Sequence, residues 1–217
     1  MTRAVIFAGG EPPHDDPWHP FAATAACVAA ALEGHGVATT TVATPAELVA
    51  VLSDAALLVM QGSASFEPTP DDAELLAVAS AHVAAGGGLL ALHSAACALP
   101  DEPGWESLIG GRWVLGDSWH PEIAPFEVRL APHVVTRGLD DFATVDERYT
   151  ALRVADDVEP LAWTDDGAER HPLAWARELG AGRVIYDALG HDERSYESAG
   201  RLALLRREAD WLLRRDA

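Results

Sequence analysis

The sequence predicts an α/β fold in which a parallel sheet carries helices on both faces. Short apolar runs at 4–8, 55–60 and 89–92 have the length and composition of buried strands. Alanine-rich segments of helical length separate them. This alternation indicates parallel strands joined by right-handed crossovers, which place helices on both sides of the sheet.

Each element of this sheet has its own local signal. Proline-rich 11–20 forms a loop after the first strand, since proline forbids regular structure there. Gly34 and Gly36 end the first helix, and Thr44 with Pro45 opens the second. We expect strands and helices in alternation at 4–8, 21–32, 37–42, 45–52, 55–60, 69–85 and 89–92.

The stretch 86–96 combines three glycines, a short apolar run and a histidine. A helix tolerates such a glycine run poorly, so we expect a loop, a buried strand and a sharp turn. His93 then lies at the carboxyl end of a strand, where open α/β sheets bind ligands. The small residues 94–96 suit a tight strand-to-helix elbow. Alternatively, the glycines merely end the preceding helix and His93 is a satisfied core histidine.

The second half of the chain changes in character. Residues 104–150 are rich in tryptophan, glycine and proline, and we expect a β-rich insertion there with antiparallel hairpins. Further strands follow at 158–163, 173–175 and 183–187, and an amphipathic helix at 198–215 closes the chain. We therefore expect a single domain over 1–217 that carries one insertion.

Composition narrows the classes of partner. The formal net charge is −19, which disfavours a nucleic-acid partner and gives little attraction to membranes. Neither a signal segment nor a membrane-spanning run is expected in this sequence. The two cysteines, Cys27 and Cys97, lack metal-ligand spacing and fit buried thiols in a reducing compartment. We expect a cytoplasmic protein.

Polar side chains with catalytic or binding chemistry follow the predicted strands or lie in the insertion. The tripeptide Trp-His-Pro occurs twice, at 18–20 and 119–121, and pairs a flat apolar face with a polar ring. Coincidence in a tryptophan-rich chain explains the repeat equally well. The candidate site residues are His19, Gln61, His93, Trp119, His120, Asp146, Glu147, Tyr149, His191, Asp192 and Glu193.

His93 after the fourth sheet strand, and a His-x-Glu unit at 191–193 after the last one, form the most specific pattern. This layout resembles class I glutamine amidotransferases, which have a flavodoxin-like fold and a cysteine nucleophile at the elbow. Here the elbow residue is His93, so the thiolate that acyl transfer requires is missing. Cys97 lies one helical turn later. We therefore do not expect glutaminase activity.

A series of further motifs follows in order along the chain, at 86–95, 108–111 with 120–121, 133–139, 146–149, 172–175, 180–186 and 189–192. Through these motifs the chain is similar, across nearly its whole length, to the trehalose-utilisation (ThuA-like) family, which shows this fold without the cysteine. Two positions depart from the family pattern: Arg148 replaces a usual leucine, and Val134 replaces a common proline.

The resemblance implies a role in the metabolism of trehalose or of related keto-disaccharides. One hypothesis is an enzyme, a sugar hydrolase or isomerase, in which His93, His191 and Glu147 act as acid, base or metal ligands. The other candidate residues would then bind a small carbohydrate. A divalent metal such as zinc suits imidazoles with a carboxylate, and the candidate ligands are His93, His120, His191 and Glu147.

The alternative hypothesis is a carbohydrate-binding or regulatory protein without catalytic activity. The missing nucleophile favours it, and tryptophans in loops would serve sugar recognition equally well. The same loops, if exposed, could form a homodimer interface. The residues alone do not decide between an enzyme and a binding protein.

Overall fold

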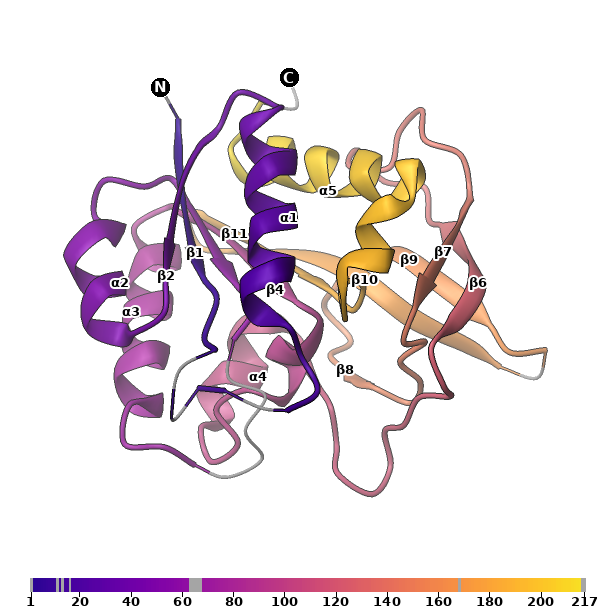
Figure 1. The fold of residues 1–217 in the computed structure, drawn as a ribbon, viewed down its shortest axis with the longest axis horizontal. Helices are drawn as coiled ribbons and strands as arrows, with labels where there is room; N and C mark the ends of the chain where they lie inside the picture. Colours follow the sequence, from indigo (N-terminus) through magenta and orange to yellow (C-terminus); the bar gives the residue numbers. More distant parts are fainter. Residues whose placement is uncertain are drawn as a thin grey trace.

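A computed structural model of the chain describes residues 2–10, 12, 14–15, 17–62, 68–167 and 169–215. Across these residues, nine strands form one sheet in the order β2-β1-β3-β4-β11-β10-β9-β6-β7 (Figure 1). The strands of this sheet are β1 (Arg3–Phe7), β2 (Ala38–Val42), β3 (Leu57–Met60), β4 (Gly88–Leu92), β6 (Ala124–Leu130), β7 (Phe142–Asp146), β9 (Glu159–Asp165), β10 (Arg170–Leu179) and β11 (Gly182–Asp187). Two short strands, β5 (Gly111–Arg112) and β8 (Arg153–Val154), pair separately.

The half of the sheet formed by β2, β1, β3, β4 and β11 is parallel. β3 and β4 are buried along their whole length, as expected for strands covered on both faces. Helices α1 (Phe21–Glu33) and α5 (Ala199–Leu212) pack together on one face, and α2 (Pro45–Leu52), α3 (Asp72–Ala84) and α4 (Pro103–Ile109) follow one another on the other (Figure 1). The predicted α/β class with helices on both faces is confirmed.

The glycine run before β4 is required by close packing. Gly86 has a φ of 98°, a left-handed conformation that glycine adopts without strain. A Cβ atom on Gly88 would lie 2.9 Å from the Leu212 side chain, so α5 packs directly on this backbone. The run therefore serves both the turn into β4 and the seating of the last helix.

The other half of the sheet is antiparallel. β10 pairs with β11 and β9, β9 pairs with β6, and β6 pairs with β7. The hairpin expected within 104–150 therefore extends the main sheet at one edge. This arrangement brings the end of β7 toward the loops that follow the parallel strands.

The prediction that 104–150 is β-rich is wrong at its beginning, where α4 forms. Pro103 occupies the first helical turn, and Trp105, Leu108 and Ile109 are buried at helical spacing. The helix ends at Gly110, which has a φ of 79°. A short amphipathic pattern within a glycine-rich and tryptophan-rich segment conceals this helix in the sequence.

None of the helices in the described part of the chain combines the length and apolar character needed to cross a membrane. The last helix begins at Ala199, and the Ser198 side chain caps its amino end.

Candidate active site

His93 forms the elbow that follows β4. It has a φ of 46°, and a non-glycine residue in this left-handed region is strained. The Tyr186 hydroxyl donates to the His93 carbonyl oxygen over 2.9 Å, and the next side chain, Ser94, donates to the Gln61 carbonyl oxygen over 2.9 Å. Trp105 Nε1 donates to the Ala95 carbonyl oxygen over 2.8 Å. The predicted sharp turn therefore exists, and surrounding side chains hold it.

The ring of His93 has a fixed orientation. Its Nδ1 lies 2.7 Å from the Ala188 carbonyl oxygen, which can only accept a hydrogen bond, so Nδ1 carries the proton. In the neutral ring Nε2 then holds a lone pair, and the Tyr149 hydroxyl lies 3.1 Å from it. A histidine whose other nitrogen donates to a carbonyl is oriented as metal-ligating histidines are.

His93 Nε2 forms a triangle with one side-chain atom of His191 and one of Glu147. His191 Nδ1 lies 3.3 Å from it and Glu147 Oε2 lies 3.4 Å from it, while His191 Nδ1 and Glu147 Oε2 are 3.1 Å apart. For a tetrahedral ion with bonds of about 2.0–2.1 Å, neighbouring ligand atoms are about 3.3 Å apart. The observed triangle has these dimensions.

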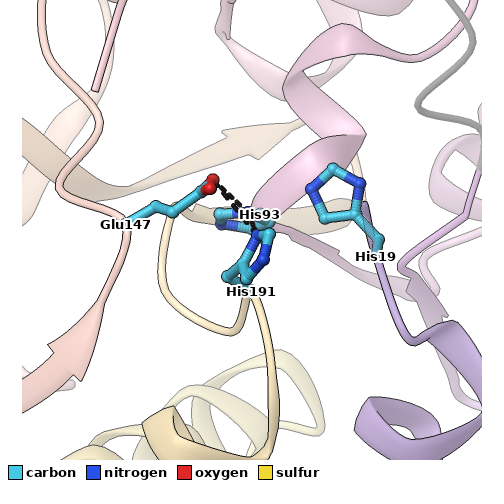
Figure 2. A group of neighbouring side chains, drawn as sticks. All are labelled: His19, His93, Glu147 and His191. Atoms are coloured by element: carbon cyan, nitrogen blue, oxygen red, sulfur yellow. Dashed lines mark hydrogen bonds and ion pairs between the residues drawn. The ribbon is translucent and has the colours of Figure 1, made fainter. Parts of the chain in front are cut away.

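His19 completes the cluster from the opposite side (Figure 2). One ligand atom each from His19, His93, Glu147 and His191 lies within 4.8 Å of the others. The ring of His19 lies 5.1 Å from that of His93 and 4.9 Å from that of His191, both in edge-on arrangements. These four residues, which we call the His3Glu cluster, come from four separate loops and fit a divalent metal ion.

The imidazoles and the carboxylate of the cluster shift the pKa values of Glu147 and His93 toward their charged forms. Burial alone would raise the pKa of Glu147, but hydrogen bonds from His191 and His93 outweigh it and hold that pKa well below its usual range. Burial alone would lower the pKa of His93, whereas its hydrogen bond to Glu147 and the nearby carboxylates raise it, and the net shift is upward. The carboxylate is therefore ionised at neutral pH.

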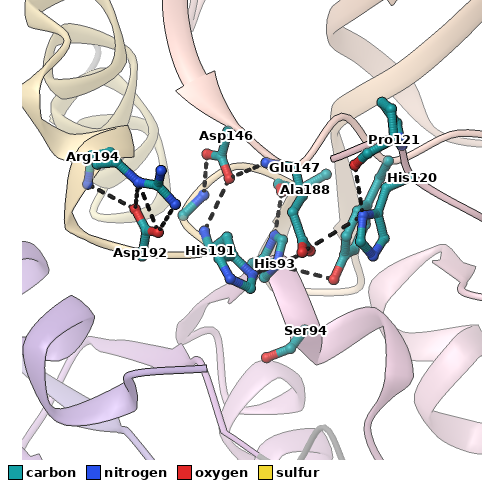
Figure 3. A network of polar contacts seen from close by, with 12 residues as sticks. His93, Ser94, His120, Pro121, Asp146, Glu147, Ala188, His191, Asp192 and Arg194 are labelled. Carbon is teal, nitrogen blue, oxygen red and sulfur yellow. Dashed lines mark hydrogen bonds and ion pairs between the residues drawn. The ribbon is translucent and has the colours of Figure 1, made fainter. Parts of the chain in front are cut away.

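Asp146 ties two parts of the site together (Figure 3). Its buried carboxylate accepts hydrogen bonds from the backbone N–H of Gly190 at 2.7 Å, of His191 at 3.1 Å and of Glu147 at 2.9 Å. It therefore joins the segment after β7 to the loop after β11. The sequence predicts Asp146 as a substrate-binding residue, but the structure shows its oxygens engaged with the backbone.

A cavity of about 550 Å³ opens above the cluster. Its walls are mainly aromatic rings, and His120 enters with Nδ1 at 3.6 Å from Glu147 Oε1. Trp113 packs at 4.6 Å from the Tyr149 ring in an edge-on arrangement. The lining residues are Pro17, Trp18, His19, Cys97, Trp113, His120, Glu147, Tyr149 and His191.

The structure thus brings together His19, His93, His120, Glu147, Tyr149 and His191 from the predicted site. Gln61 lies on the other side of His93, where it lines a small hollow beside Ser94 and His191. Its amide nitrogen donates to the Tyr196 hydroxyl at 3.5 Å. The position of Gln61 is therefore beneath the cluster and not in the wall of the main cavity.

Three predicted residues lie away from the main cavity. Asp192 pairs with Arg194 at 2.6 Å and caps the following turn of 3-10 helix (Glu193–Glu197), where Glu193 is exposed. Trp119 forms a bridge with the Thr150 backbone and is 49% exposed. We leave these three residues outside the candidate site.

Sequence reasoning missed Trp113 and the Ala188 carbonyl group. Trp113 lies in the segment between β5 and β6, where only its aromatic type could have drawn attention. A backbone carbonyl carries no sequence signal at all. The repeated Trp-His-Pro tripeptide was the better indication, because both of its histidines line the cavity.

The family profile described as trehalose utilisation, ThuA, matches residues 3–212 of the chain. The chain belongs to the ThuA family. The match confirms the resemblance that the sequence motifs indicate. No functionally curated protein matches this ThuA chain.

Solved structures share the fold of this ThuA chain. A ThuA-like protein from Parabacteroides merdae has a TM-score of 0.77 at 19% identity, over 98% of this chain and 90% of that one. A ThuA-like protein from Bacteroides uniformis has a TM-score of 0.75 at 18% identity, over 97% and 91%. The cytoplasmic protein STM3548 from Salmonella typhimurium has a TM-score of 0.62 at 11% identity, over 98% and 99%. At these identities the likeness establishes the fold.

Proposed function

We propose that this ThuA-family protein is an enzyme that transforms a disaccharide or its keto derivative with a divalent metal at the His3Glu cluster. The observation that carries the proposal is the convergence of His93, Glu147 and His191 at ligand-like distances on the floor of a cavity. The family description, trehalose utilisation, supports the choice of carbohydrate as substrate.

The chemistry of the donor set favours a metal of the zinc type. Imidazole nitrogens with one carboxylate suit zinc and neighbouring divalent transition metals. The His93 Nδ1 proton is already committed to Ala188, so Nε2 is the atom available to an ion. When bound, such an ion supplies Lewis acidity that polarises a sugar oxygen.

The residues around the cluster supply proton transfer and orientation. Glu147 is ionised, as a metal ligand must be, and its second oxygen faces the His120 imidazole, a side chain of the type that most often transfers protons. The Tyr149 hydroxyl, beside His93 Nε2, can donate a hydrogen bond to a sugar oxygen. Such acid and base groups serve either hydrolytic cleavage or isomerisation of a sugar. The elbow residue is an imidazole and not a thiol, so we do not assign glutamine hydrolysis to this site.

The cavity suits a small carbohydrate in size and lining. Its volume of about 550 Å³ falls in the usual range of small-molecule sites, roughly 300–1,000 Å³. Trp18 is 63% exposed yet lines the cavity, so its ring is available to a ligand at the entrance. Aromatic faces of this kind pack on the apolar faces of ligands, while His120 and Glu147 offer hydrogen bonds.

The same aromatic lining favours a second candidate function, sugar binding without turnover. The exposed Trp18 and the more buried Trp113 line the same cavity and would hold a sugar whether or not a reaction follows. In that case the His3Glu cluster would be a structural metal site or a hydrogen-bonded group. Product analysis separates the two functions.

The test is incubation of the protein, with zinc or cobalt and after chelation, with a panel of disaccharides and their keto derivatives. We expect metal-dependent product formation that His93→Gln and His191→Gln each abolish. His82 of α3 contacts Gly88 at the start of β4, at the other end of the strand from His93, so His82→Gln serves as the matched control and should retain activity. Binding without product would contradict the enzyme and favour the binding protein.

We further propose that the protein acts in the cytoplasm on a small molecule. Cys27 and Cys97 form no disulfide in the structure, which suits a reducing compartment. The net charge of −19 makes nucleic acid an unsuitable partner.

We also propose a homodimer contact at the exposed apolar side chains of Leu115, which is 76% exposed, and Trp119. Light scattering of the purified protein would test that contact.

A further inference from the structure

Three fully buried ionisable side chains lie together beneath the loop that carries His191. Arg201 of α5 approaches Asp187 at the end of β11 with 2.8 Å between Nη1 and Oδ2. The same nitrogen lies 3.7 Å from Glu208 Oε2, about two turns further along α5. All three side chains have no solvent exposure. A buried cluster of this kind is costly unless every charge is balanced.

This ion cluster holds both polar backbone groups of Leu189. Asp187 Oδ1 accepts a hydrogen bond from the Leu189 N–H at 2.9 Å. Arg201 Nη2 donates to the Leu189 carbonyl oxygen at 3.4 Å. The backbone of Leu189 is thereby held by two residues, Asp187 and Arg201, that do not line the cavity.

Leu189 lies between the two backbone features that shape the His3Glu cluster. The residue before it, Ala188, provides the carbonyl oxygen that orients the His93 ring. The two residues after it, Gly190 and His191, donate their N–H groups to Asp146. Movement of Leu189 would therefore shift the Nδ1 partner of His93 and the position of His191 together.

The charge count within the ion cluster requires a proton. Two carboxylates face one guanidinium, and Asp187 Oδ2 and both Glu208 oxygens lack a conventional hydrogen-bond donor. A proton on one Glu208 oxygen, donated to Asp187, gives the Asp187 carboxylate a donor and leaves one negative charge to match Arg201. Burial first, and then the neighbouring Asp187 charge, raise the pKa of Glu208 well above its usual value, which supports this assignment.

We infer that Asp187, Arg201 and a protonated Glu208 are positioning residues, which hold loop 188–191 so that His93 and His191 meet at the candidate metal site. The inference rests on the proposed function only in assigning His93 and His191 to an active site. It adds that the last helix of the chain controls the geometry of that site from the interior.

The test compares two isosteric substitutions by histidine NMR of the metal-free protein and by cobalt affinity. Glu208→Gln imitates the protonated acid and should leave the His93 and His191 ring signals in place, with cobalt affinity within about 3-fold of wild type. Asp187→Asn removes the charge that balances Arg201, and should shift both ring signals and weaken cobalt binding by at least about 10-fold, the lower end of outer-shell effects.

Two further variants separate positioning from a general loss of stability. Leu48→Ala opens the buried core under α2, so it should lower the unfolding midpoint without moving the two ring signals. Arg201→Lys keeps the charge but loses the planar fork that reaches Asp187 and Leu189 together. We expect Arg201→Lys to fold and to shift the ring signals of His93 and His191. This variant therefore tests the positioning role even if Asp187→Asn does not fold.

The inference would be overturned by unchanged ring signals and cobalt affinity in Arg201→Lys. Glu208→Gln behaving like Asp187→Asn would overturn the assignment of the proton. Wild-type protein that binds no cobalt would contradict the proposed metal site alone, because the ring signals of the metal-free protein still report on positioning.

Discussion

His93 donates its Nδ1 proton to the Ala188 carbonyl oxygen over 2.7 Å. This one contact couples the elbow after β4 to the loop after β11, and it turns Nε2 toward Glu147 and His191. The backbone of His93 is left-handed. The site therefore depends on a strained residue whose ring and carbonyl group are both held by neighbours.

The strain at His93 predicts an unusual order of stability among its variants. His93→Gly should be more stable than His93→Ala by about 1 kcal/mol, because a left-handed conformation costs residues with a Cβ roughly 1–2 kcal/mol. Urea unfolding of the two metal-free variants measures the difference. Equal stability, or a more stable alanine variant, would mean that the elbow is not left-handed.

Asp146 should prove to be a structural residue of the site. Asp146→Asn leaves a single acceptor oxygen for three backbone N–H groups and removes the charge. We expect the free energy of unfolding to fall by about 1.5–3 kcal/mol, the usual worth of hydrogen bonds to a charged group. The exposed residue Asp156 provides the control, since its substitution by Asn should change stability by less than about 0.5 kcal/mol. Similar stability of the two variants would contradict the structural role of the Asp146 carboxylate.

The two Trp-His-Pro tripeptides provide a matched pair for sugar binding. Trp18 lines the cavity, whereas Trp119 lies outside its lining. Trp18→Ala should weaken disaccharide binding by about 3–10-fold, equivalent to roughly 0.5–1.5 kcal/mol of aromatic contact. Trp119→Ala should bind as wild type does. Calorimetric titration distinguishes them, and an equal loss in both variants would argue against the cavity as the sugar site.

The charge pair between Glu147 and His93 predicts a pH-dependent stability of the metal-free protein. The lowered pKa of Glu147 stabilises the fold above its ordinary value of 4.5, and this contribution is lost as pH falls. The raised pKa of His93 stabilises the fold below its ordinary value of 6.5, and this contribution is lost as pH rises. Both contributions are present between these two values.

Glu147→Gln should therefore lose most stability relative to wild type between about pH 4.5 and 6.5, the ordinary pKa values of the two groups. The difference in stability between wild type and Glu147→Gln should be smaller at pH values below and above this range. Urea unfolding midpoints across the pH range provide the measurement. A gap that widens steadily from pH 6 to pH 9 would show that the His93 pKa is not raised.

Much of the fold follows from the sequence because its signals are local. The runs at β3 and β4 are apolar throughout, and Thr44 with Glu47 forms the capping box that opens α2. Helix α4 is missed because seven residues among glycines and tryptophans give a weak periodic signal. The joining of the β6–β7 hairpin to the main sheet is a long-range pairing, which local patterns do not encode.

The sequence predicts most of the residues of the candidate site, but not the hydrogen bonds and contacts that each of them makes. His93, His191 and Glu147 can be chosen because strand ends of a parallel sheet meet at one edge. The choice between His19 and His120 as the further ligand depends on how two long loops fold, and the sequence names His120 while the structure places His19 in the cluster. The sequence also suggests a binding role for Asp146, because the three backbone N–H groups that it binds carry no sequence signal.

Cobalt titration of the metal-free protein, followed by its visible absorption spectrum, tests the central claim most directly. We predict that one cobalt ion binds per chain and that its absorption spectrum is typical of an ion with few ligands. His19→Gln should lower the cobalt affinity by more than the roughly 10–100-fold cost of changes to residues outside the ligand set. His120→Gln, the matched histidine of the second tripeptide, should stay within about 10-fold of wild type. Absence of stoichiometric binding, or equal behaviour of wild type, His93→Gln and His191→Gln, would contradict the metal site.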